Sequence, residues 1–112
     1  MQPKKNPLGL NALQLKTLTL LQELARLPAY SRPMEEVGVA VRPPEPHGDH
    51  FHVGNAVVAT RDATGLRNPA VWVALERKGL IRSMYPHGAV VTSLGLDYET
   101  GLREVIFHKS GD

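Results

Sequence analysis

The stretch 65-GLRNPAVWVALERKGLI-81 predicts a short helix with well-defined ends. Asn68 is a good N-cap, and Pro69 follows it at the first helical position, where a missing backbone N–H costs nothing. Gly79 supplies the left-handed residue that commonly ends a helix. We therefore expect a helix over 69–78, followed by an extended segment that returns toward the core.

The composition is that of a globular chain. Of its 112 residues, 42% are hydrophobic and 21% are charged, which fits one domain over 1–112. The chain has no cysteine, so disulfides, thiolate metal sites and cysteine nucleophiles are excluded. No segment approaches the roughly 20 apolar residues of a membrane span, and polar residues interrupt the N-terminal leucines. We expect a soluble, cytoplasmic protein without a signal peptide.

The N-terminal third predicts a long helix after a flexible arm over 1–9. Asn11 can cap a helix over 11–27, and Gln14 completes a capping box three residues later. The apolar residues of this helix form a stripe wider than one core face needs. Either a long partner helix or a second subunit is expected to cover the additional side. The apolar stripe of this helix consists of Leu13, Leu18, Leu20, Leu21, Leu24, Ala25 and Leu27.

The segment over 28–48 contains five prolines and two glycines, so we expect a proline-rich loop region with a short strand over 37–42. A second strand candidate over 50–59 is interrupted at Gly54 and Asn55. Whether 55–64 is helix or strand stays open.

The C-terminal third predicts a turn, a strand and a last helix. The turn falls at 84–88 and the returning strand at 89–92. Thr92 or Ser93 can cap a helix over 93–108. Five apolar residues of this segment fall on one face at helical spacing. They are Leu94, Tyr98, Leu102, Val105 and Ile106.

Two motifs follow each other in this order: LERKGLI at 75–81 and VTSLG at 91–95. Together they resemble the winged helix-turn-helix superfamily, above all bacterial regulators of the multiple-antibiotic-resistance-repressor type. The resemblance covers 65–101 and reaches the first helix by position only. It implies an α+β winged-helix-like domain: a long N-terminal helix, short strands, a recognition-like helix, a β-hairpin wing and a C-terminal helix. It also implies DNA binding and a homodimer formed through the helices at 11–27 and 93–108.

Two features depart from the pattern of these regulators. The first helix of the motif should lie within 55–66, where Val57 and Val58 favour a strand. The outward positions of the recognition-like helix include Trp72 and Val73, which are apolar, together with Glu76, which phosphate repels. If Trp72 is exposed, this face suits a protein partner better than DNA. If Trp72 belongs to the core, DNA binding stays open.

The first hypothesis is a small, non-enzymatic DNA-binding regulator of transcription. Cations exceed acidic residues between 61 and 82, which is compatible with phosphate contacts but equally typical of a solvated face. The candidate helix contacts are Arg67, Asn68, Arg77 and Lys78, and the candidate wing contacts are Arg82 and His87. The alternative is a winged-helix-like module that binds another protein. No nucleophile elbow, phosphate-binding loop or dinucleotide-binding glycine pattern occurs, so we expect no enzyme.

The stretch 47-HGDHFH-52 is unusually rich in potential metal ligands. His47, Asp49, His50 and His52 could bind zinc, because neutral imidazoles and carboxylates are good ligands for this ion. On a strand, His50 and His52 would share one face. The simpler alternative is the solvent-facing side of an edge strand without metal. A pH switch is a variant, since two adjacent protonated histidines repel each other.

Overall fold

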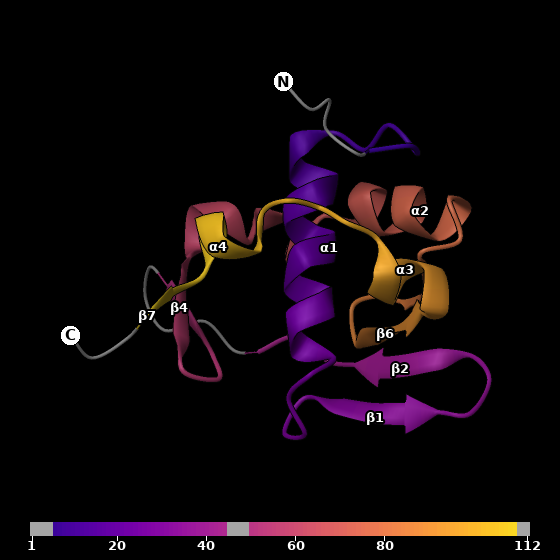
Figure 1. The fold of residues 1–112 in the computed structure, drawn as a ribbon, viewed down its shortest axis with the longest axis horizontal. Helices are drawn as coiled ribbons and strands as arrows, with labels where there is room; N and C mark the ends of the chain where they lie inside the picture. The colour runs from indigo at the N-terminus through magenta and orange to yellow at the C-terminus, as the bar shows by residue number, and fades with distance from the viewer. Residues whose placement is uncertain (1–5, 45–49, 110–112) are drawn as a thin grey trace.

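A 13-residue helix, α1 (Ala12–Leu24), stands at the centre of the computed structural model, which describes residues 6–44 and 50–109. Figure 1 shows a four-stranded sheet with two helices on one side of α1 and a smaller sheet with a short helix on the other. The chain is thus a small mixed α+β fold with antiparallel sheets, as the sequence indicates.

The larger sheet has the strand order β1-β2-β6-β5, and all its pairs are antiparallel. Two hairpins build it, and β2 joins them by pairing with β6. The β1–β2 turn and the β5–β6 turn lie at opposite ends of the sheet, because Gly38 pairs with Thr92 and Val41 with Ala89. The strands are β1 (Ser31–Met34), β2 (Gly38–Val41), β5 (Ile81–Met84) and β6 (Gly88–Thr92).

The smaller sheet has the order β3-β4-β7 and is also antiparallel. The strand candidate at 50–59 is therefore a hairpin, and its interruption at Gly54, with φ of 62°, is the turn. The question left open for 55–64 is answered by a strand followed by 3-10 turns. The strands are β3 (His50–Val53), β4 (Ala56–Ala59) and β7 (His108–Lys109).

The capping box predicted for α1 is confirmed. The side chain of Asn11 accepts from the backbone N–H of Gln14 at 2.8 Å, and the side chain of Gln14 accepts from the backbone N–H of Asn11 at 3.0 Å. The helix ends at Leu24 rather than Leu27, because the N–H groups of Arg26 and Leu27 bond to carbonyl oxygens three residues back instead of four.

The wide leucine stripe of α1 is covered within the chain. Leu18, Leu20, Leu21 and Leu24 are all at most 1% exposed. A helix with structure on two sides needs a broader apolar surface than a helix that covers one face. The stripe therefore gives no argument for a second subunit.

The expected loop region at 28–48 contains the β1–β2 hairpin, of which only β2 was predicted. Pro33 lies in β1, which is an edge strand, where a residue without a backbone N–H is tolerated. The proline-rich composition concealed this strand.

The expected helix over 93–108 is wrong. Two short helices, α3 (Ser93–Asp97) and α4 (Arg103–Ile106), take its place. Between them the chain is extended at Tyr98, and Thr100 is buried with its hydroxyl 2.6 Å from that of Thr19 on α1. Packing on α1 therefore overrides the helical spacing of the apolar residues, and no continuous C-terminal helix is present to form a dimer.

Candidate nucleic-acid interface

The recognition-like helix α2 (Pro69–Arg77) forms as the sequence indicates. The side chain of Asn68 caps it by accepting from the N–H of Ala70 at 3.1 Å. One side of α2 is buried through Val71, Trp72 and Leu75. The helix is thus held against the body of the protein by its apolar side while its other side faces solvent.

Trp72 belongs to the core and not to the surface. Its side chain is fully buried, and its indole N–H donates to the carbonyl oxygen of Gly65 at 3.0 Å. Its ring packs edge-to-face on Tyr85, with centroids 5.3 Å apart. The outward face of α2 is therefore less apolar than its sequence suggests.

Two 3-10 turns precede α2 where a helix-turn-helix motif has its first helix. They are η1 (Thr60–Asp62) and η2 (Thr64–Arg67). Gly65 lies so close to α1 that an added Cβ would come within 1.8 Å of the Thr17 hydroxyl oxygen. This close approach, which only glycine allows, brings η2 against α1 and thereby sets the start of α2.

The end of α2 is tied to the following hairpin. Gly79 adopts a φ of 77°, and the Thr92 hydroxyl donates to its carbonyl oxygen at 2.7 Å. The Glu76 carboxylate accepts from the backbone N–H of Ser83 on β5 at 3.0 Å. The negative charge of Glu76 is unfavourable for DNA binding, but this side chain has a structural role at the edge strand of the sheet.

Three of the six candidate DNA contacts form two groups, one near each end of α2. Arg67 lies at the start of α2 and, with Tyr85 and Pro86 of the β5–β6 turn, lines a pocket of about 330 Å³. Arg77 and Lys78 lie at the other end of α2, about 13 Å away by helix rise. Five of the six are exposed, namely Arg67, Arg77, Lys78, Arg82 and His87, whereas Asn68 is half-buried and caps the helix.

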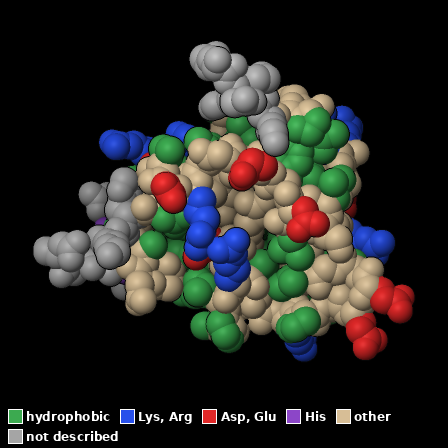
Figure 2. Space-filling model, in the orientation of Figure 1, with side chains coloured by type: hydrophobic (Ala, Val, Ile, Leu, Met, Phe, Trp, Pro, Cys, Tyr) green, Lys and Arg blue, Asp and Glu red, His purple; other side chains and the backbone are tan. Residues whose placement is uncertain are grey.

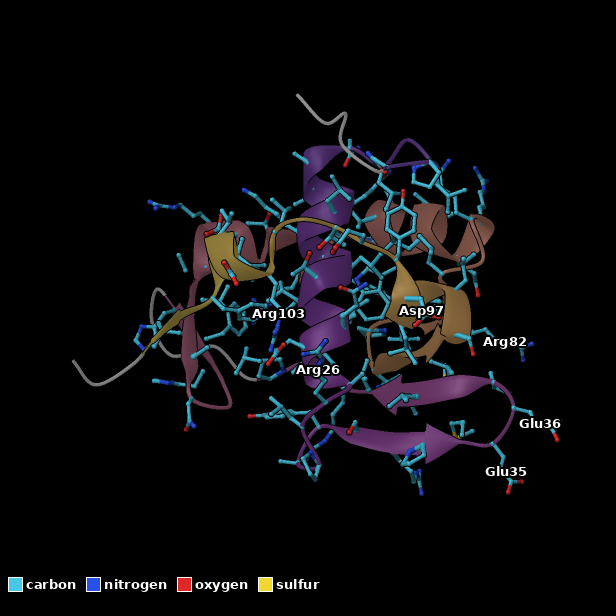
Figure 3. All side chains as sticks on the ribbon, in the orientation of Figure 1. Arg26, Glu35, Glu36, Arg82, Asp97 and Arg103 are labelled. Atoms are coloured by element: carbon cyan, nitrogen blue, oxygen red, sulfur yellow. The ribbon has the colours of Figure 1, made fainter. Side chains whose placement is uncertain are left out.

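The arginines and the lysine of this set have no ion-pair partner in the part of the chain that the structure describes. The surrounding charge is nevertheless mixed. Figure 3 shows Arg82 on the same side of the molecule as Asp97, with Glu35 and Glu36 at the tip of the β1–β2 turn. Figure 2 likewise shows cations and acidic groups interspersed on the face of the molecule that it draws. Any attraction for phosphate is therefore local rather than spread over a broad positive surface.

Sequence reasoning missed an exposed apolar residue beside α2. Met84 on β5 is 51% exposed, and Val73 on α2 is 45% exposed. Both adjoin the hydrogen bond between Glu76 and Ser83, because Val73 precedes Glu76 by about one turn and Met84 follows Ser83. The exposure of Met84 could have been predicted from the alternation of side chains along β5, because Met84 lies on the same face of the strand as the charged Arg82.

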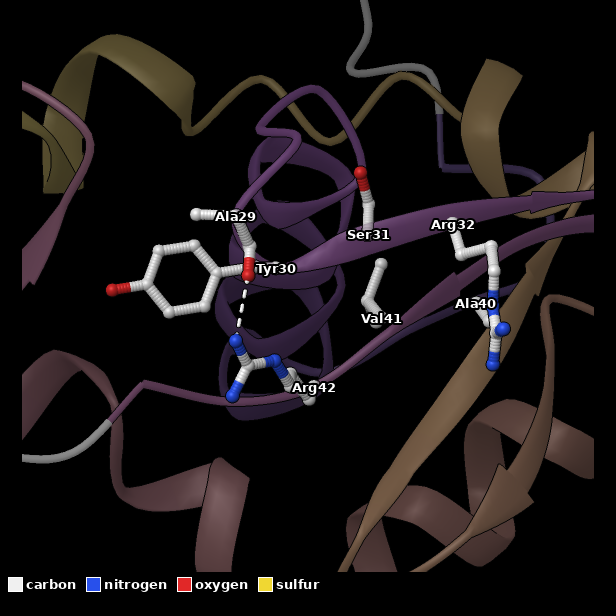
Figure 4. A pocket seen from close by; sticks show the side chains of 7 residues that line it. All are labelled: Ala29, Tyr30, Ser31, Arg32, Ala40, Val41 and Arg42. Carbon is white, nitrogen blue, oxygen red and sulfur yellow. Dashed lines mark hydrogen bonds between the residues drawn. The ribbon is translucent and has the colours of Figure 1, made fainter.

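A second pocket, of about 350 Å³, opens beside the β1–β2 hairpin (Figure 4). Arg42 lines this pocket. Its guanidinium group donates to the carbonyl oxygen of Ala29 at 2.8 Å and lies 5.7 Å from the ring centroid of Tyr30. These contacts hold the strand end to the loop that precedes β1.

Of the four candidate metal ligands, the structure places two. His50 and His52 lie on β3 with their Nε2 atoms 3.2 Å apart, while His47 and Asp49 lie outside the described residues. Phe51 and Val53 point into the core and His52 is exposed, so the expected alternation of this strand is confirmed. Within the described ranges, no group of three or more potential ligands comes together.

Comparisons of the chain with models of known protein families, with curated proteins and with solved structures found no match. Among the helices that the structure describes, none has the length and apolar character needed to cross a membrane. The geometry and chemistry of the residues themselves therefore carry the functional argument.

Proposed function

We propose that this chain is a small winged-helix-like DNA-binding protein that acts as a non-enzymatic regulator of transcription in the cytoplasm. The helix α2 enters the major groove, and the β5–β6 hairpin serves as the wing beside it. Arg67, Arg77 and Lys78 contact DNA from the helix and its ends. Arg82 and His87 contact it from the hairpin.

The observation that carries this proposal is the set of exposed cations around α2, which have no acidic partner among the residues that the structure describes. A cation without an acidic partner keeps its full charge for phosphate, and each phosphate contact releases counterions from DNA. The burial of Trp72 leaves DNA binding open, because it removes one apolar group that would have favoured a protein partner at this face. The anchored ends of α2 support it too, since a fixed helix loses little freedom on entering a groove.

The test is fluorescence anisotropy of a labelled mixed-sequence duplex, titrated with protein at several salt concentrations. We expect non-specific dissociation constants of roughly 1 to 100 micromolar, weakening steeply as salt rises. The double variant Arg77→Ala/Lys78→Ala should bind more weakly. Its plot of log affinity against log salt should be shallower by about 1.8, the loss expected for two phosphate contacts.

A matched control is the double variant Arg26→Ala/Arg32→Ala, which removes the same charge from exposed positions away from α2. Figure 3 places Arg26 at the far end of α1 from α2. We expect this control to keep the salt slope of the original protein. Equal losses in both double variants would mean that net charge alone attracts DNA. Absence of binding at low salt would contradict the proposal.

A protein partner is the second candidate, favoured by the exposure of Val73 and Met84 beside Glu76. Such a partner would cover apolar side chains that DNA does not need. The double variant Val73→Ser/Met84→Ser should then lose a partner captured from a cell extract while its affinity for DNA stays unchanged. If the same variant loses affinity for DNA, the two functions share one surface.

A further inference from the structure

The histidines of β3 approach each other through their outer ring nitrogens. Nε2 of His50 and Nε2 of His52 are 3.2 Å apart, whereas the ring centroids are 4.8 Å apart and the ring planes meet at 81°. The two nitrogens therefore lie on the sides of the rings that face each other. Convergence of two good ligand atoms at this separation is the geometry that a bound metal ion requires.

The separation matches the bite of a single ion. Zinc binds imidazole nitrogen at about 2.05 Å. An ion at that distance from both nitrogens would make an N–metal–N angle of about 103°, close to the tetrahedral value of about 109° that zinc prefers. The separation of the two nitrogens is therefore compatible with both rings binding one ion.

The strand holds the pair in place. Phe51 and Val53, which alternate with the histidines, are 4% and 2% exposed, and the backbone of β3 pairs with β4 along its whole length. His50 is half-buried and His52 is exposed. Ligands on a strand anchored from its opposite face lose little freedom on binding, while the exposed side leaves an approach for the ion.

We propose that His50 and His52 form a binding site for one divalent metal ion of the first transition row, with zinc as the reference ion. Imidazole nitrogen suits zinc, nickel and copper(II), whereas calcium and magnesium prefer oxygen. Two imidazoles occupy two coordination positions, and water fills the others. The site does not depend on DNA binding, because it lies on the smaller sheet and uses none of the residues of the α2 face.

A hydrogen bond between the rings is the competing explanation, since one neutral imidazole can donate to the other at 3.2 Å. The two explanations differ in their response to metal. A hydrogen-bonded pair without metal affinity gives no saturable binding. A metal site binds one ion per chain through both rings.

The first experiment is calorimetric titration of the full, untagged chain with zinc chloride. We expect one ion per chain, and weaker binding by at least about tenfold in His50→Ala and in His52→Ala, because loss of even an outer-shell partner typically costs that much. The control is His87→Ala, which removes an exposed histidine from the β5–β6 turn and should bind as the original chain does. Equal binding in all four proteins, or no saturable binding, would overturn the proposal.

A second measurement uses the original chain alone, so it does not depend on the folding of a variant. Nitrogen-15 spectra of the histidine rings are recorded during the same zinc titration. We expect the Nε2 resonances of His50 and His52 to shift together and to saturate at one ion per chain, while those of His87 stay in place. Shifts confined to other histidines, or spread equally over all of them, would contradict a site at this pair.

Discussion

The two sheets on either side of α1 are attached to the rest of the molecule in different ways. On the side of the larger sheet, backbone as well as side chains pack closely: an added Cβ at Gly95 of α3 would come within 2.0 Å of the Leu80 carbonyl oxygen, and within the sheet one at Gly88 of β6 would come within 2.3 Å of that of Val41 on β2. On the side of the smaller sheet, α4 reaches α1 through the ion pair of Arg103 with Glu23, at 2.9 Å. The candidate DNA surface belongs to the larger, tightly packed side, and the histidine pair to the other.

The difference teaches where precision is needed. A DNA-recognition helix must be fixed relative to the β-hairpin that serves as its wing. Close backbone contacts fix it because they leave no space for alternative packing. An ion site made by neighbours on one strand carries its geometry within that strand. It therefore depends less on how its sheet meets the rest of the fold.

The largest expected effect is that of Trp72→Ala, which removes a fully buried side chain that contacts Gly65 and Tyr85. We expect the free energy of unfolding to fall by about 3 to 5 kcal/mol, because a large buried ring leaves a cavity. Urea denaturation measures this loss. Trp72→Phe keeps a ring against Tyr85 but leaves the Gly65 carbonyl oxygen without its donor, so a smaller loss of about 1 to 3 kcal/mol is expected. Equal losses would show that the hydrogen bond, and not the packing, dominates.

Paired glycine substitutions sharpen the comparison between the two sides. Gly95→Ala places a methyl group against the Leu80 backbone and should cost about 3 kcal/mol, since the neighbouring strand must shift. Gly54→Ala, in the β3–β4 turn, meets only the end of the Leu27 side chain at 3.1 Å. Its cost should be about 1 to 2 kcal/mol, arising from a φ of 62°. Thermal unfolding of both variants gives the order, and the reverse order would contradict the proposed difference in packing.

The smallest expected effect is that of Glu23→Gln, which breaks the ion pair with Arg103. The hydrogen bond and the charge of Glu23 raise the pKa of Arg103 above its usual value. A raised pKa adds stability below the usual pKa of arginine and loses it only as pH rises through the raised value, so Arg103 stays charged at neutral pH. We expect a loss of about 0.2 to 1 kcal/mol because the pair is partly exposed. Denaturation at low and high salt checks this loss, which should shrink at high salt.

Local structure was predicted well where a cap or a turn residue acts on its immediate neighbours. The helix expected over 69–78 forms over 69–77, and the box of Asn11 and Gln14 forms as expected. The alternation at 50–53 also matches the structure. In each case the physical cause lies within a few residues, so the sequence contains it in full.

Structural features that depend on residues distant in the sequence were not predicted. The helical spacing over 93–108 is real, yet Thr100 bonds to Thr19 and the chain breaks into two helices. Strand β1 was hidden because pairing with β2, and not propensity, makes it a strand. Of the histidine cluster, the sequence indicated the shared face, whereas the distance between the two nitrogens was found only in the structure.

By itself, the sequence determined the start of α1, both ends of α2, the mixed α+β composition of elements and the residues available for DNA or metal. Only the tertiary structure decided that Trp72 is core, that both sides of α1 are covered within one chain and that the candidate cations form two groups. The physical reason is one of range. Caps, turns and alternation act over a few residues, whereas burial and relative placement depend on which distant surfaces exclude water together.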